Sequence, residues 1–417
     1  MTVPAPSASP GPAAPPGPSA RPGAHAFPQL DGLRAIAALS VVLTHVAFLT
    51  GEVISPGPFA PLLSRLNFGV TLFFLLSGFL LHRPFVRAAL TGRPAPGLGR
   101  FWLRRALRIF PAYWLALAVL IPVAGTTPFG VRDVVGYATL THTYGDTPGD
   151  PALTQMWTLV VELSFYLVLP VLARLSLRGR DPMAVLRRQV VLLLGLVAVT
   201  LAYVPVIRAV LPSNRQPLLW LPAYLDWFAL GMALAVASVV LAAPELTGRC
   251  HLGALRRVAE DAGTCWVIGG LLLWTATLPL AGPRTLDPPT GWEWASQHGL
   301  YAAAAAFLML PCVLGDRSGS VLLRVLGSPP LRFLGEISYG IYLWHLGIIV
   351  LVFRVLDRPV FGAGFWMILV PTLAVTVTVA AASYWLLERP VLSLGRRRRA
   401  PSSSGTSSPA SATAQHS

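Results

Sequence analysis

Long runs of apolar residues, separated by short polar stretches, dominate the pattern of this chain. Each run approaches the roughly 20 residues that a helix needs to cross the hydrocarbon core of a bilayer. Gly, Pro and Arg gather in the stretches between the runs, where helices end. The pattern predicts ten spanning helices, at residues 31–50, 67–82, 109–124, 155–173, 189–207, 218–242, 264–280, 297–314, 337–353 and 363–387. We therefore expect an all-α polytopic membrane protein whose helices surround a central cavity.

Polar segments divide the chain further. Residues 1–28 are rich in Pro and Ala and lack the basic and apolar regions of a signal peptide, so we expect a disordered arm followed by an uncleaved first span. Residues 29–395 would form the membrane domain. Residues 396–417 are basic and then rich in Ser and Ala, which predicts a disordered tail. The gap 125–154 is long enough to hold a short interfacial or re-entrant piece.

Composition supports a membrane protein. Of the 417 residues, 54% are hydrophobic and 12% charged, whereas soluble domains carry roughly 25% charged residues. The net charge is +15, and all 32 basic residues are Arg. Such a charge can indicate nucleic-acid binding, but here 25 arginines fall in the predicted inner segments and seven in the outer ones. This distribution predicts a plasma-membrane protein with both termini in the cytoplasm and no nucleic-acid partner.

Cysteines and metal ligands add no further site. Cys250, Cys265 and Cys312 are widely spaced, and no Cys or His pair has the spacing of a zinc site. We therefore expect neither a disulfide framework nor a bound metal.

The first span carries three ionisable side chains in an apolar segment. Asp31 and Arg34 are three residues apart, so they are neighbours on a helix. Arg34 and His45 are eleven apart, which places them on one face about 16 Å apart along the axis. Such residues inside a membrane usually have a function. The alternative is that Asp31 and Arg34 anchor the helix at the interface while His45 bonds within the bundle.

The predicted topology places Glu162 and His45 at similar depths. Each lies about 7–10 Å below the outer surface, counted from the outer end of its span. A carboxylate bonded to the imidazole would orient the ring and raise its basicity. The alternative is that Glu162 pairs with another buried polar group.

Arginines also precede the third span. Arg104 and Arg108 are neighbours four residues apart on a helix, and Arg105 lies between them. Guanidinium groups bind phosphates in a bidentate manner, so this cluster fits a phosphate-bearing cytoplasmic ligand. Taken alone, however, these residues favour an ordinary positive-inside cluster.

Other polar residues in the apolar runs favour packing. Ser77 and Gly78 suit close helix approach better than catalysis. Asp226 suits a structural hydrogen bond. In the ninth span, Tyr339 and Tyr342 are three residues apart and can either line a polar cavity or make polar packing contacts between helices.

Five motifs, in order, resemble the acyltransferase family 3 of membrane proteins over roughly residues 28–392. The ninth-span motif agrees in part, because the family often continues it with x-Pro, where this chain has Leu346-Gly347. The motifs are Leu30-Asp31-Gly32-Leu33-Arg34 with His45; Phe73-Phe74 with Ser77-Gly78-Phe79; Arg104-Arg105 with Arg108-Ile109, Pro111 and Tyr113-Trp114; Trp157-Thr158-Leu159 with Glu162 and Phe165-Tyr166; and Ser338-Tyr339 with Tyr342-Leu343-Trp344-His345.

The resemblance implies transfer of an acyl group from acyl-CoA, as co-substrate with no bound cofactor, to a hydroxyl of a carbohydrate or glycosylated small molecule. It implies that Arg34 and His45 are essential. His45 would be the general base, with Glu162 stabilising the imidazolium; direct transfer and an acyl-histidine route both stay open. The expected substrate-binding residues are Asp31, Arg34, Arg104, Arg105, Arg108, Trp157, Tyr166, Tyr342 and His345.

A proton-coupled transporter is the main alternative function. His45, Glu162 and His345 could then relay protons. Transporters are often built from inverted repeats, and the two halves of this sequence show no clear repetition. A scaffolding membrane protein is a third possibility, in which Arg34 and His45 would be dispensable.

Overall fold

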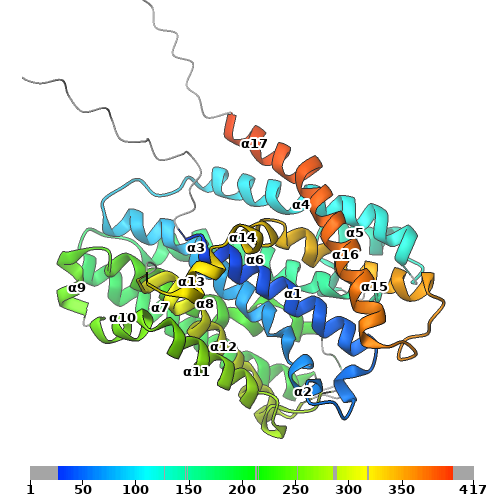
Figure 1. Ribbon diagram of the computed structural model, residues 1–417. Coiled ribbons are helices and arrows are strands. Elements are labelled where there is room, and N and C mark those ends of the chain that lie inside the picture. The colour runs from blue at the N-terminus through cyan, green and yellow to red at the C-terminus, as the bar shows by residue number, and fades with distance from the viewer. Residues whose placement is uncertain are drawn as a thin grey trace, which may run out of the picture.

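The computed structural model describes residues 27–125, 127–145, 147, 149–211, 214, 216–250, 252–284, 289–316 and 319–397. Throughout these ranges the regular structure is helical, without strands (Figure 1). This confirms the all-α class. Nearly all of the predicted disordered arm, 1–28, and tail, 396–417, lies outside the described residues.

Nine helical segments of the described chain are long and apolar enough to cross a bilayer, once the short turns joined to them are included. Their main helices are α1 (Gln29–Leu49), α3 (Gly69–Leu90), α4 (Leu98–Ala124), α6 (Trp157–Ser176), α7 (Pro182–Val210), α8 (Leu225–Val240), α12 (Gly291–Leu314), α15 (Ser338–Val355) and α16 (Phe365–Ser383).

Shorter helices connect these segments. They are α2 (Ala60–Leu63), α5 (Val131–Ala138), α9 (Pro244–Cys250), α10 (Gly253–Glu260), α11 (Ala262–Thr275), α13 (Val321–Leu326), α14 (Pro329–Glu336) and α17 (Arg389–Arg397). Single turns complete the fold: η1 (Glu52–Ile54), η2 (Leu66–Phe68), η3 (His142–Tyr144), η4 (Thr154–Met156), η5 (Gln216–Leu219), η6 (Leu221–Tyr224), η7 (Pro279–Ala281) and the π-helical η8 (Tyr384–Glu388).

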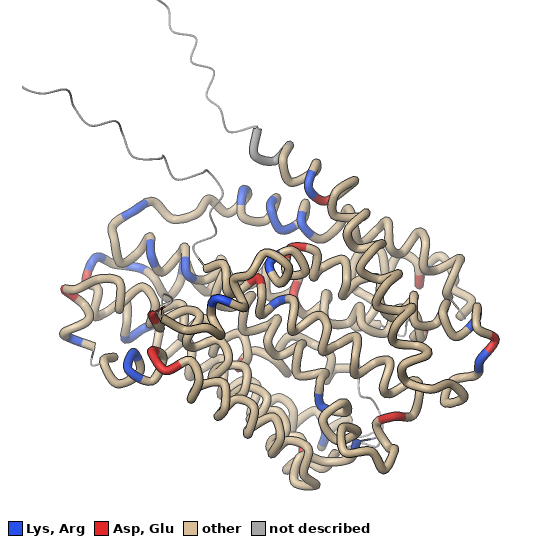
Figure 2. Tube along the Cα trace, in the orientation of Figure 1, with Lys and Arg blue, Asp and Glu red and all other residues tan. Residues whose placement is uncertain are grey.

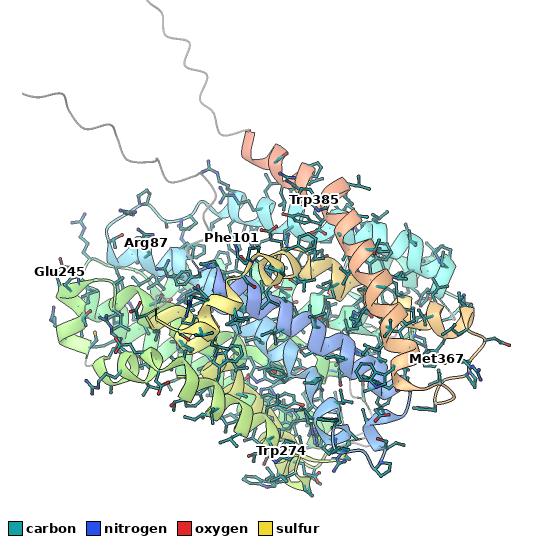
Figure 3. All side chains as sticks on the ribbon, viewed as in Figure 1. Arg87, Phe101, Glu245, Trp274, Met367 and Trp385 are labelled. Carbon is teal, nitrogen blue, oxygen red and sulfur yellow. The ribbon has the colours of Figure 1, made fainter. Side chains whose placement is uncertain are left out.

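The seventh predicted span differs from the prediction of ten full spans. Residues 264–280 do not form one long helix, because α11 ends at Thr275 after 14 residues and only the short turn η7 follows. At 1.5 Å per residue α11 is about 21 Å long, shorter than the roughly 30 Å hydrocarbon core. It packs along α12, and its Trp274 lies at the end of the bundle opposite Glu245 (Figure 3). The segment thus keeps its place in the order of helices while being shorter than a full span.

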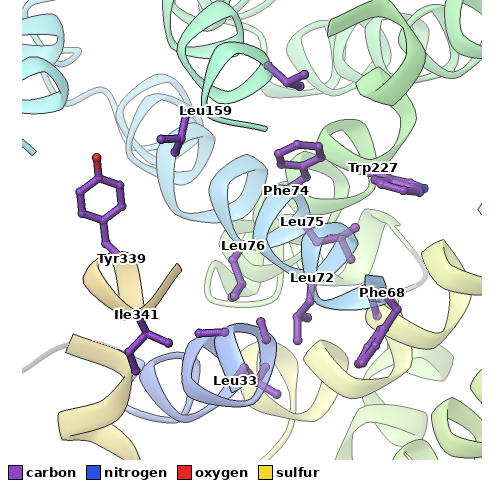
Figure 4. Packing of buried hydrophobic residues seen from close by; sticks show 14 of the residues in the cluster. Leu33, Phe68, Leu72, Phe74, Leu75, Leu76, Leu159, Trp227, Tyr339 and Ile341 are labelled. Atoms are coloured by element: carbon purple, nitrogen blue, oxygen red, sulfur yellow. The ribbon is translucent and has the colours of Figure 1, made fainter. Parts of the chain in front are cut away.

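Helix α3 is the central element of the core. It packs against α8 over much of its length and also contacts α1, α6 and α12. Figure 4 shows Leu72 and Leu76 of α3 directed toward Leu33 of α1. On another side of α3, the ring of Phe74 stacks on Phe228 of α8, with 4.7 Å between ring centroids. These contacts hold the helices that carry the site residues against one another.

Two glycines allow α3 and α8 to cross closely. A Cβ atom added to Gly78 would collide with the backbone oxygen of Phe228, and one added to Gly231 would collide with that of Leu75. At these two positions the crossing therefore has room for the hydrogen of glycine but not for a side chain. This confirms the prediction that Gly78 serves close helix packing.

Charge is distributed unevenly over the bundle. Arginines gather where α3 ends and α4 begins, and around α9 and α10 (Figure 2). Arg87, Phe101 and Glu245 lie toward this end, and Met367 and Trp274 toward the opposite one (Figure 3). We call the first the arginine end of the bundle.

After α4, the described residues 127–145 form a folded segment that we call the cap. It contains α5, as the prediction of a short piece within 125–154 required. His142 stacks on the ring of Tyr137, with 4.3 Å between centroids and an angle of 14° between the planes. Burial lowers the pKa of His142 to about 4, so the imidazole is neutral at pH 7.

Gly231→Ala should destabilise the protein because its methyl group has no room at the α3–α8 crossing. Overpacking of this kind typically costs about 1–3 kcal/mol, and we expect a lower midpoint of thermal unfolding in detergent. Gly195→Ala on α7 is the matched control, because a Cβ there meets no atom within 4 Å. Equal midpoints for the two variants would contradict the close crossing.

The cap around His142 should open as the pH falls. An exposed imidazole has a pKa near 6.5, so protonation favours the opened cap between pH 6.5 and 4, by about 2 kcal/mol at pH 5. Hydrogen exchange of residues 139–145, corrected for intrinsic rates, should therefore increase from pH 7 to pH 5. His142→Asn should remove this dependence; if the variant keeps it, another group is responsible.

Candidate active site

Three cavities adjoin one another in a row through the bundle. The arginine cavity, about 590 Å³, lies between the end of α3 and the start of α4. The central cavity, about 100 Å³, shares Leu80, Leu81 and Arg105 with it. The histidine cavity, about 300 Å³, shares Val70 and Tyr342 with the central one. The narrow central cavity thus lies between two wider ones and shares walls with both.

The arginine cavity is strongly cationic. Pro94 and Pro96 lie in the non-helical connection that brings the start of α4 beside the end of α3. No acidic residue is found among the described residues that line it. This cavity is suited to a ligand with several negative charges. Its arginines are Arg83, Arg87, Arg93, Arg100, Arg104 and Arg105.

The central cavity combines partly buried cations with hydroxyl groups. Arg34 of α1 donates from Nε to Ser338 Oγ of α15 over 3.2 Å. Arg108 of α4 forms an ion pair with Glu388, 3.4 Å between Nη1 and Oε2. Glu388 ends the π-helical turn η8, and such turns are frequent at functional sites. The four elements together hold two guanidinium groups beside one narrow space.

Glu162 also belongs to the central cavity. Its Oε1 accepts hydrogen bonds from Ser77 Oγ at 2.7 Å and from the Tyr166 hydroxyl at 2.5 Å. The guanidinium of Arg105 lies 5.9 Å from the centroid of the Tyr166 ring. The predicted pairing of Glu162 with His45 is wrong: equal depth on two helices does not fix their rotation, and this carboxylate is directed to α3.

His45 pairs with a second imidazole instead. Its Nδ1 lies 2.9 Å from the backbone oxygen of Val41 and 3.2 Å from Nε2 of His345. A carbonyl oxygen only accepts, so His45 Nδ1 carries the hydrogen and His45 Nε2 is left with its lone pair. The Nδ1 of His345 lies 2.7 Å from the oxygen of Tyr342, which in the same way leaves His345 Nε2 as an acceptor. The described partners therefore define one tautomer for each ring.

The histidine cavity contains a second polar pair that the sequence did not indicate. His298 of α12 lines it, and His298 Nε2 lies 2.9 Å from Oδ2 of Asp226 on α8. Asp226 thus has a hydrogen-bonding partner, as predicted. That partner is 72 residues away, so no local spacing could identify it. Arg83, Arg87, Arg93 and Arg100 lie in a predicted inner segment, where the positive-inside rule accounts for them without a ligand.

The predicted site residues are distributed along the row of cavities. Arg104 lines the arginine cavity and Trp157 lines the histidine cavity. His345 lines none of the three cavities and contacts His45 through its Nε2. Asp31 lines none of the three cavities. The central cavity collects most of the others: Arg34, Arg105, Arg108, Glu162, Tyr166 and Tyr342.

The described residues hold no group of three His, Cys, Asp or Glu side chains that could bind a metal ion. The three cysteines are free thiols. The side chains that line the three cavities offer imidazole, guanidinium, carboxylate and hydroxyl groups.

Comparison with known proteins identifies similar sequences over most of the chain. A family profile described as "Acyltransferase domain" matches residues 27–385. The peptidoglycan O-acetyltransferase OatA of Listeria monocytogenes is 27% identical over 382 residues, which cover 87% of this chain and 55% of that protein. The O-acetyltransferase OatA of Staphylococcus aureus is 23% identical over 384 residues, covering 88% and 57%. The chain thus spans little more than half the length of these relatives. No solved structure matches.

Proposed function

The chain belongs to the acyltransferase-domain family, and from this membership we propose that it is a membrane-embedded O-acyltransferase using acyl-CoA as donor and a carbohydrate hydroxyl as acceptor. The observation that carries the proposal is the row of cavities, with arginines at one end and the His45 imidazole at the other. Acyl-CoA has the matching shape: a phosphate-rich nucleotide, a long thin arm and a terminal thioester.

The donor would enter from the arginine end. Guanidinium groups bind phosphates through paired hydrogen bonds, so the arginine cavity suits the nucleotide. The thin arm would pass through the central cavity beside Arg34 and Ser77. This route brings the thioester toward His45 and holds it there, which replaces a bimolecular encounter by an ordered one.

His45 would act as the general base. Its Nε2 would accept the proton of the acceptor hydroxyl while that oxygen attacks the thioester carbonyl. The carbon–sulfur bond then breaks, and the CoA thiolate takes the proton from the imidazolium. The positive charge on His45 would be stabilised by Nδ1–H bonds to Val41 and His345, a task that the sequence had assigned to Glu162.

Orientation follows from the distribution of arginines. The positive-inside rule would place the arginine end, and with it both termini, in the cytoplasm of a plasma-membrane protein. The histidine cavity would then face the outer side, where a cell-wall glycan is found. The names of the relatives make acetyl the first acyl group to test and peptidoglycan the first acceptor.

Family membership favours this enzyme over the proton-coupled transporter. The hydrogen bonds favour it as well, because Glu162 is bonded to Ser77 and Tyr166, not to the two imidazoles that a relay would join it to.

His45→Gln should abolish most of the transfer. Loss of a general base costs about 10²–10⁴-fold, while the KM for acetyl-CoA should change little because His45 lies outside the arginine and central cavities. The assay uses purified protein, radiolabelled acetyl-CoA and a tetramer of N-acetylglucosamine. His82→Gln is the control, since this imidazole is buried within the bundle but lines none of the three cavities. Wild-type rates in His45→Gln would refute the proposed base, and proteoliposome uptake without acyl turnover would favour a transporter.

Arg93→Gln and Arg100→Gln should each raise the KM for acetyl-CoA. One hydrogen bond to a charged group is worth about 1.5–3 kcal/mol, or roughly 10- to 100-fold in affinity. The kcat should be nearly unchanged, because these residues lie in the cavity farthest from His45 in the row. With S-acetylpantetheine, which lacks the nucleotide, the variants should match the wild type. Arg324→Gln, outside the three cavities, is the control; an equal KM increase there would point to bulk charge alone.

A further inference from the structure

The histidine cavity contains an imidazole that the proposed reaction does not use. His298 Nε2 lies 3.0 Å and 2.9 Å from the two carboxylate oxygens of Asp226, so this nitrogen donates to the carboxylate. Within the described residues, Nδ1 of the same ring has no hydrogen bond, and it is not among the buried polar atoms that lack a partner. This nitrogen is therefore accessible to a ligand.

Two indole rings hold the His298 ring in place. Trp227 stacks on it with 4.1 Å between ring centroids and 18° between the planes, and Trp294 contacts it at 4.6 Å and 33°. The aromatic contacts and the carboxylate together restrict tilting and rotation of the ring. A fixed ring with one available nitrogen is a preorganised hydrogen-bonding group.

Two amide side chains of the same cavity each use one of their two polar atoms in a hydrogen bond. The hydroxyl of Tyr301 donates to Asn67 Oδ1 at 2.6 Å and accepts from Gln297 Nε2 at 3.2 Å. These bonds set the orientation of both amides. Asn67 Nδ2 is left as a donor and Gln297 Oε1 as an acceptor, in a cavity that both residues line. The wall therefore offers donors and acceptors at fixed positions.

The lining is also rich in aromatic side chains. Trp157 and Trp294 contribute indole rings to the same cavity. Its volume of about 300 Å³ is at the lower end of the range for small-molecule sites. Aromatic surfaces beside paired donors and acceptors fit a ligand with an apolar ring face and a rim of hydroxyl groups, such as one sugar unit.

We propose that the Asp226–His298 pair anchors the acceptor: His298 Nδ1 hydrogen-bonds one hydroxyl of a sugar unit in the histidine cavity, which directs another hydroxyl of that unit to His45. Asp226 acts through His298 and is a positioning residue. This inference rests on the proposed function and adds to it a subsite for the acceptor. A hydroxyl can donate to the bare nitrogen or accept from a protonated one, so the anchor serves both forms of the ring.

Two reactions separate the anchor from the donor site. Hydrolysis of acetyl-CoA without acceptor tests the proposed function, and transfer to the N-acetylglucosamine tetramer tests the anchor. His298→Phe keeps a flat ring between the indoles and removes both nitrogens. We expect the KM for the tetramer to rise roughly 10- to 100-fold, with the rate of hydrolysis within about twofold of the wild type.

Asp226→Asn should give a smaller rise in the same KM with an unchanged kcat, because the amide oxygen still accepts from Nε2. A purely structural role would instead lower kcat, or the yield of folded protein. Since His298→Phe leaves Asp226 without its partner, the double variant Asp226→Leu/His298→Phe, which removes both polar groups, keeps the test valid if the single variant fails to fold.

His142→Asn is the matched control, because this imidazole is similarly buried but lies outside the histidine cavity. A tetramer KM within threefold of the wild type in His298→Phe or in the double variant would overturn the anchor, and so would an equal loss of hydrolysis and transfer. Absence of hydrolysis and transfer in the wild-type protein would instead contradict the proposed function itself.

Discussion

The cost of leaving a polar group without a partner among apolar helices governs this structure. Water is absent from a bilayer core, so each buried imidazole, guanidinium or carboxylate needs a hydrogen-bonding partner from the chain. His45 finds the Val41 carbonyl and His345, Arg34 finds Ser338, and Glu162 finds Ser77 and Tyr166. The partners decide the chemistry, because a carbonyl beside Nδ1 leaves Nε2 of His45 as the free nitrogen. The hydrogen bonds that make burial possible thereby also select the reactive atom.

Much of this arrangement could be predicted from the sequence, because one helix contains the information. The eleven-residue spacing of Arg34 and His45 is enough to place both on one face, and the structure puts them in two cavities that adjoin through Val70 and Tyr342. The lengths of the apolar runs likewise predicted the spanning helices. The exception is the seventh predicted span, where α11 ends at Thr275. The contacts between different helices could not be predicted in this way. Depth could be counted along each span for Glu162, but its rotation toward α3 depends on packing that no single segment specifies. Asp226 and His298 were undetectable as a pair for the same reason.

The narrow central cavity gives the proposed reaction its order. The ion pair between Arg108 and Glu388 joins α4 to η8 beside this cavity, and the bond between Arg34 and Ser338 joins α1 to α15. A space of about 100 Å³ between cavities of about 590 and 300 Å³ suits a thin chain better than a nucleotide. Donor and acceptor would therefore meet only at the histidine cavity, each held from its own side. Such holding supplies much of the advantage of an enzyme that joins two substrates.

The two imidazole sites of the histidine cavity differ in their partners. His298 donates from Nε2 to the Asp226 carboxylate, which leaves Nδ1 available, whereas His45 is bonded through Nδ1 to a carbonyl oxygen and to another imidazole, which leaves Nε2 available. A general base needs a free lone pair at the reacting hydroxyl, and the bonds of His45 leave one at Nε2. An anchor only has to hydrogen-bond a hydroxyl, which either form of His298 can do. Each ring thus presents one available nitrogen to the same cavity, as a base and an anchor for two hydroxyls of one sugar unit would require.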